Sequence, residues 1–119
     1  MSRRHSFGVR LAFVACDENA RLLTLDLKTM KVVGSMGIGS SPDVLAFDTS
    51  LKRLCVAGES GVVAVAAEYG RKLVKLGQGE LAPNAHTVAV DPATHLVYLP
   101  LERGHAGRPE LRIMKPTGS

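Results

Sequence analysis

Residues 87–100 read TVAVDPATHLVYLP, in which two short apolar segments flank the turn-forming sequence Asp91-Pro92-Ala93-Thr94. Aspartate before proline is typical of a type I turn, because the carboxylate accepts backbone hydrogen bonds and the proline ring fixes the next φ. Short Val- and Leu-rich segments bounded by turn residues indicate β-strands. The stretch therefore predicts a β-hairpin.

The same pattern occurs elsewhere in the chain. Residues 44–48 align with residues 87–91 at an offset of 43, and residues 54–57 align with residues 97–100 at the same offset and with residues 12–15 at an offset of 42. Further along, Gly37 and Gly39 align with Gly77 and Gly79 at an offset of 40. A fixed period of this kind is the sequence signature of a repeat architecture.

Each period holds four short strands. In the middle copy we expect them at residues 44–47, 54–57, 61–65 and 72–76. No stretch has a sustained 3.6-residue apolar period, so almost no helix is expected. Four antiparallel strands in about 40–45 residues form one blade of a β-propeller. The predicted fold class is therefore all-β, an incomplete propeller of four-stranded antiparallel blades.

At these residues the sequence resembles the YVTN-type repeat propellers. Their blades carry a first strand ending in Asp-Pro, a turn, and a second strand of the Tyr-Val-Thr-Asn type, which corresponds here to residues 88–99. Weaker copies lie at residues 45–57 and 13–17, and the likeness extends from about residue 11 to residue 115. The resemblance implies six to eight blades around a central channel, often in exported proteins with varied functions.

The chain is too short for such a propeller. Residues 1–10 are expected to be a basic N-terminal segment, because Ser2-Arg3-Arg4-His5 is not apolar. The four strands of a blade are lettered a to d in chain order. Residues 11–116 then form a partial propeller: strands b–d of a first blade (11–39), a complete blade (42–79), and strands a–c of a third (85–115). These are ten strands, resembling the C-terminal part of a longer propeller. Open blade faces and edges favour association, so we expect a homo-oligomer or pairing with a missing propeller half.

One end of the blades gathers groups that could bind a metal. Asp43 and His86 each precede the first strand of successive blades, whereas Asp17, Glu59 and Glu102 open the loops that follow second strands on the same face. Carboxylates with neutral imidazole form a workable ligand set for a divalent cation. The candidate metal ligands are therefore Asp43, His86 and Glu102. Acidic residues that open turns also commonly cap backbone N–H groups, and this structural role remains the alternative.

Other chemistry has little support in the sequence. Residues 37–41, GIGSS, lack the Lys-Ser/Thr of a phosphate loop, and no G-x-S-x-G motif is present. Cys16 and Cys55 have no metal or redox spacing and are expected to be buried thiols. Asp48, Asp91 and His95 are expected to be turn residues, with His95 solvated. No catalytic or cofactor-binding residue is assigned.

Charge and hydropathy exclude further classes. Fifteen Lys and Arg against eleven Asp and Glu give a net charge of +4, but the cations are scattered and only five aromatic residues are present, so nucleic-acid binding is not expected. No apolar run approaches the ~18–20 residues of a membrane span. The basic N-terminus is not followed by an apolar core, so we expect no signal peptide and a cytoplasmic location.

Two functions are consistent with these features. The first is a non-enzymatic binding module that covers its open edges by oligomerisation. The alternative is part of a metal-dependent hydrolase or oxidoreductase whose site is completed by further blades. A third possibility is a gene remnant without a selected activity. The natural ligand is not determined by the sequence.

Overall fold

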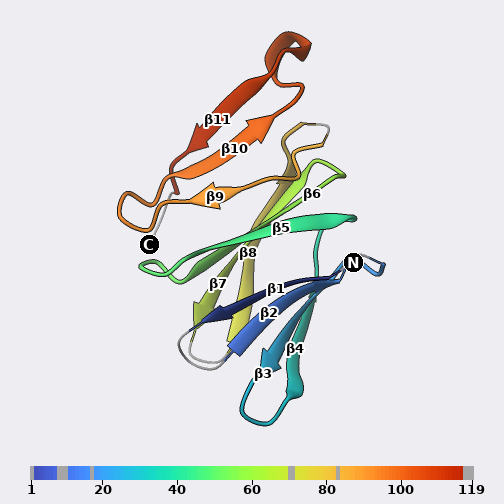
Figure 1. The fold of residues 1–119 in the computed structure, drawn as a ribbon, viewed down its shortest axis with the longest axis vertical. Helices are drawn as coiled ribbons and strands as arrows, with labels where there is room; N and C mark the ends of the chain where they lie inside the picture. Colours follow the sequence, from blue (N-terminus) through green and yellow to red (C-terminus); the bar gives the residue numbers. More distant parts are fainter. Residues whose placement is uncertain (1, 8–10, 17, 70–71, 83, 117–119) are drawn as a thin grey trace.

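The computed structural model describes residues 2–7, 11–16, 18–69, 72–82 and 84–116, which form three antiparallel sheets. Figure 1 shows the sheets stacked along the longest axis of the molecule. Sheet 1 contains β1 (Ser2–Phe7), β2 (Leu11–Cys16), β3 (Arg21–Asp26) and β4 (Lys31–Gly37). Sheet 2 contains β5 (Pro42–Asp48), β6 (Arg53–Gly58), β7 (Val62–Tyr69) and β8 (Lys72–Glu80). Sheet 3 contains β9 (Ala89–Val90), β10 (Val97–Leu101) and β11 (Glu110–Met114).

The first sheet differs from the sequence-based expectation. Residues 1–10 were expected to lie outside the propeller, but β1 pairs along its whole length with β2, from Ser2 opposite Cys16 to Phe7 opposite Leu11. A strand pairs through its backbone N–H and C=O groups, so Ser2-Arg3-Arg4-His5 does not need an apolar pattern to be a strand. The described residues therefore hold eleven strands, and the first sheet has its strand a.

The second strand of sheet 2, β6, is covered on both faces. Successive residues of a strand point to opposite faces, and all of β6 except Arg53 is buried. Leu54 and Val56 pack with Phe13 and Leu22 of sheet 1. Cys55 and Ala57 point the other way and pack with Leu99 and Leu101 of sheet 3. The almost continuous apolar sequence of β6 is thus explained by burial on both faces.

The connection between β5 and β6 and that between β9 and β10 contain the predicted aspartate turns. The Asp48 Oδ1 atom accepts hydrogen bonds from the N–H groups of Ser50 (2.9 Å) and Leu51 (3.0 Å). Asp91 Oδ1 accepts one from Ala93 N–H at 2.9 Å. These bonds satisfy backbone donors that no strand partner can reach. The prediction that Asp48 and Asp91 form turns is confirmed.

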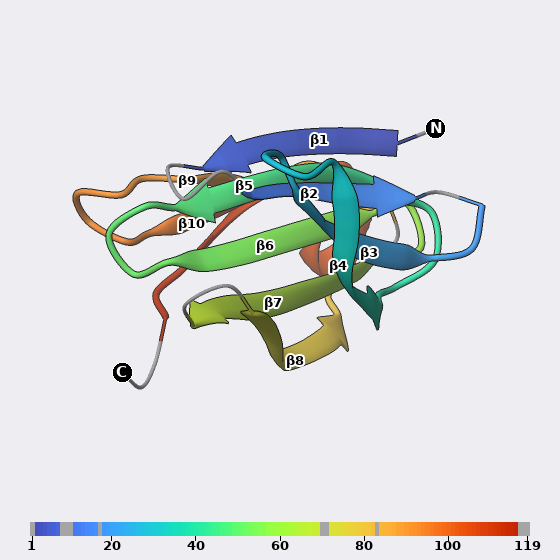
Figure 2. The same ribbon diagram turned by 90° about the horizontal axis from the view of Figure 1, so that it is seen from below.

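The first strands of the three sheets lie along one edge of the molecule (Figure 2). β5 contacts β1 on one side and β9 on the other. The strands farthest from this edge are β4 and β8 in the first two sheets. The only helical element among the described residues is a short 3-10 turn, η1 (His105–Gly107), in the loop between β10 and β11. No helix in this part of the chain is long and apolar enough to span a membrane.

Candidate functional site

The structure brings together two of the three predicted metal ligands. Asp43 lies near the start of β5 in sheet 2, and His86 lies in the loop that precedes β9 in sheet 3. His86 Nδ1 is 3.0 Å from Asp43 Oδ2, and both side chains are about one-third to one-quarter exposed. The same nitrogen lies 3.4 Å from the Thr87 hydroxyl. The pair therefore joins sheet 2 to sheet 3 at the starts of their first strands.

The remaining predicted ligands do not join this pair. Within the described ranges, no three His, Cys, Asp or Glu side chains lie close enough to hold a metal ion, so Glu102 and Glu59 stand apart from Asp43 and His86. Asp17 lies outside the described residues, as does the side chain of His105. A cation on Asp43 and His86 would thus need ligands beyond these residues.

A second pair of this kind joins the same two sheets at the other ends of their first strands. Asp48 ends β5, and His95 lies in the turn between β9 and β10. His95 Nδ1 is 2.8 Å from Asp48 Oδ2, and the Asp48 side chain is only 4% exposed. His95 was expected to be a solvated turn residue. It instead contacts the neighbouring sheet, with its own backbone at a φ of 66°.

The sequence contained a signal for this contact. Asp48 and Asp91 open equivalent turns of successive blades, and equivalent turns of neighbouring blades lie side by side. A histidine four residues after Asp91 therefore lies beside the Asp48 turn, although 47 residues separate the two side chains in the chain.

The environment of Asp48 favours its charged form. Burial alone would raise the pKa of the carboxyl, but the hydrogen bonds from Leu51 N–H, His95 and Ser50 N–H together hold it below its ordinary value of 3.8. A buried carboxylate is stable only when its oxygens accept hydrogen bonds. Asp48 therefore remains ionised at neutral pH and fixes the turn and the His95 ring together.

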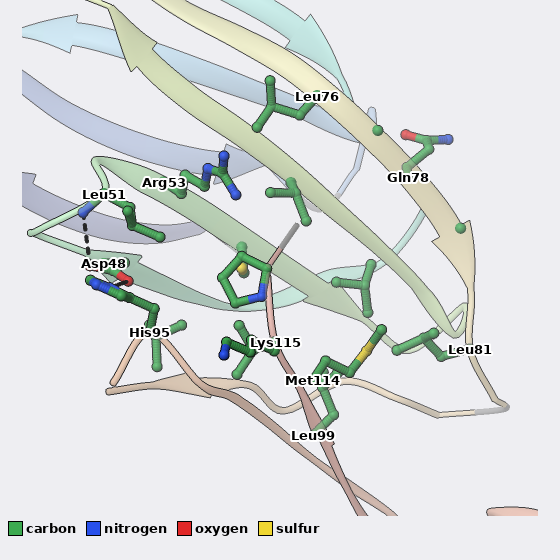
Figure 3. A pocket seen from close by; sticks show the side chains of 18 residues that line it. Asp48, Leu51, Arg53, Leu76, Gln78, Leu81, His95, Leu99, Met114 and Lys115 are labelled. Carbon is green, nitrogen blue, oxygen red and sulfur yellow. Dashed lines mark hydrogen bonds and ion pairs between the residues drawn. The ribbon is translucent and has the colours of Figure 1, made fainter. Parts of the chain in front are cut away.

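A cavity of about 500 Å³ lies between sheets 2 and 3, beside this second pair (Figure 3). Its wall is mainly apolar, with Asp48 and His95 at one side and Gln78 at the other. The residues from sheet 2 and its loops are Asp48, Leu51, Arg53, Cys55, Val63, Val65, Leu76, Gly77, Gln78, Gly79 and Leu81. Those from sheet 3 and the segment after β11 are Val90, His95, Val97, Leu99, Met114, Lys115 and Pro116.

Cys55, His95 and Asp48 all line this cavity, but the thiol is not activated. Burial and the charge of Asp48 raise the pKa of Cys55 to about 11, against a smaller opposing effect of Arg53. With this pKa, the Cys55 thiol is protonated at neutral pH. Only the thiolate is an effective nucleophile, so Cys55 is not reactive there. The residue is 4% exposed. Its role is to pack sheet 2 against sheet 3, as predicted for a buried thiol.

Apolar side chains also lie on the outer face of sheet 3. Tyr98 is paired with Ile113 and Pro100 with Leu111, which places these four side chains on the face opposite to the buried Leu99. Leu111 and Ile113 are more than half exposed. The outer face of sheet 1 is similar, because Leu25 pairs with Val32 and Val32 is 57% exposed.

Solved structures with the same arrangement of sheets identify the architecture. Dihydro-heme d1 dehydrogenase NirN in complex with DHE matches 93% of the chain with a TM-score of 0.73 at 15% identity. The β-propeller domain of Cps50 (Swd1) from Myceliophteria thermophila matches 96% with a TM-score of 0.67 at 11% identity. The fold is that of a partial β-propeller. A chain of the mitotic checkpoint complex matches 95% with a TM-score of 0.73 at 9% identity.

The partial β-propeller spans 23% of the NirN chain, 36% of the checkpoint-complex chain and 42% of the Cps50 domain. No family model and no curated protein sequence matches the chain. The likeness at these identities shows the fold alone, and the specific YVTN family remains a prediction.

Proposed function

We propose that the chain is a non-enzymatic interaction module that covers its two open sheet faces by self-association. The observation that carries this proposal is that both outer faces of the stack expose apolar side chains: Tyr98, Pro100, Leu111 and Ile113 on sheet 3, and Leu25 and Val32, beside the Arg21–Ser35 pair, on sheet 1. Val32, Leu111 and Ile113 are each more than half exposed, and apolar surface exposed on a sheet face marks interaction sites. Inside the stack, faces of the same character are buried against a neighbouring sheet.

The geometry favours a ring of two copies. Sheet 3 of one copy would pack against sheet 1 of the other, and the same contact would form a second time across the twofold axis. Three sheets per copy give six blades in the dimer, within the four to eight that propellers use. A head-to-tail contact that closes on itself forms a ring rather than a filament.

The mass in solution tests this proposal. Light scattering coupled to size exclusion is expected to give a discrete dimer. Ile113→Lys places a charge among the exposed apolar side chains of the sheet 3 outer face and should give monomers. The matched control is Met30→Lys, because Met30 is 64% exposed in the β3–β4 turn and lies outside both faces. A folded wild-type monomer, or an Ile113→Lys protein that remains dimeric, would contradict the proposal.

A second candidate is supported by the contact between Asp43 and His86. A divalent metal held there could act as a Lewis acid in a hydrolase or oxidoreductase, with further ligands supplied from outside the described residues. The test is isothermal titration calorimetry of the protein with Zn²⁺ or Mn²⁺. Stoichiometric binding that is lost in Asp43→Ala and His86→Ala would support this function. If the wild type does not bind the metal, or if both variants bind it as tightly as the wild type does, this function is excluded.

A further inference from the structure

We draw no further inference here: the strongest candidate, the cavity of about 500 Å³ between sheets 2 and 3 beside the Asp48–His95 pair, is bordered by Lys115 and Pro116 at the end of the described residues, and nothing in the structure shows what covers it.

Discussion

The two interfaces of the stack are built from equivalent strands but are filled differently. Between sheets 1 and 2, the large side chains of Phe13, Leu22 and Leu54 are at most 1% exposed and pack in one cluster. Between sheets 2 and 3, the sheet 2 side contributes Cys55, Ala57 and valines, and about 500 Å³ remains open. Val63 and Val65, which line this open space, are only partly buried. The following predictions test this difference.

The largest effect is expected from matched core truncations. Leu54 is buried in the first interface, whereas Leu99 lines the cavity in the second. Leu54→Ala should lower the free energy of unfolding by about 3–5 kcal/mol, because it leaves a void in a closely packed cluster. Leu99→Ala should cost about 2–3 kcal/mol, because Leu99, although buried, borders space that is already open. Urea denaturation measures both, and equal losses would show that the two interfaces are equally packed.

The two His–Asp pairs between sheets 2 and 3 differ in burial. Asp48 is 4% exposed and Asp43 is 26% exposed. Asp48→Ala should cost about 2 kcal/mol or more, because it removes three hydrogen bonds and leaves turn donors unsatisfied. Asp43→Ala should cost less than about 1 kcal/mol. Asp48→Asn retains an oxygen for the turn and tests the His95 contact by itself. A larger loss from Asp43→Ala would contradict this ranking.

The lowered pKa of Asp48 predicts how the stability of the protein responds to acid. The folded chain holds the Asp48 proton less tightly than the unfolded chain, because the pKa of Asp48 is lowered from 3.8. Its stabilising contribution is therefore complete above that pH and is lost as the pH falls through the lower folded-state value. The difference in stability between wild type and Asp48→Asn should narrow below pH 4 in thermal melts. A constant difference from pH 7 to pH 2 would be inconsistent with an ionised Asp48.

Alanine substitutions at two glycines should change the stability by smaller amounts and in opposite directions. A Cβ at Gly39 would lie 2.6 Å from Val62 Cβ, whereas one at Gly79 meets nothing within 4 Å. Gly39→Ala should destabilise by about 1–3 kcal/mol through overpacking. Gly79→Ala should stabilise by about 0.4–1 kcal/mol by restricting the unfolded chain. Thermal unfolding of the two variants distinguishes the filled interface from the open one. If both substitutions destabilise equally, the space above Gly79 is not open.

The smallest effect concerns alkaline pH. The folded chain holds the Cys55 proton more tightly than the unfolded chain, because the pKa rises from 9.0 to about 11. Stability is unaffected below pH 9 and falls as the pH approaches 11, with a loss of about 1 kcal/mol by pH 10. Cys55→Ala should lack this loss when chemical denaturation is compared at pH 8 and pH 10. A variant with the same slope as wild type would assign the effect to other groups.

The sequence by itself determined the period, the turns and the strands other than β1. The short apolar segments on either side of the Asp48 and Asp91 turns located the hairpins, because turn chemistry acts within a few residues. The equivalence of Asp43 and His86 in successive copies also led to a real contact between them. β1 was missed because its pairing with β2 depends on backbone groups that every residue carries.

Only the tertiary structure decided which faces and ends meet. The His95–Asp48 contact and the cavity join residues from different sheets, and Glu102 lies away from the pair that it was expected to complete. These features depend on how whole sheets stack against one another. Stacking is governed by the combined surfaces of several strands, so no single stretch of the sequence specifies it.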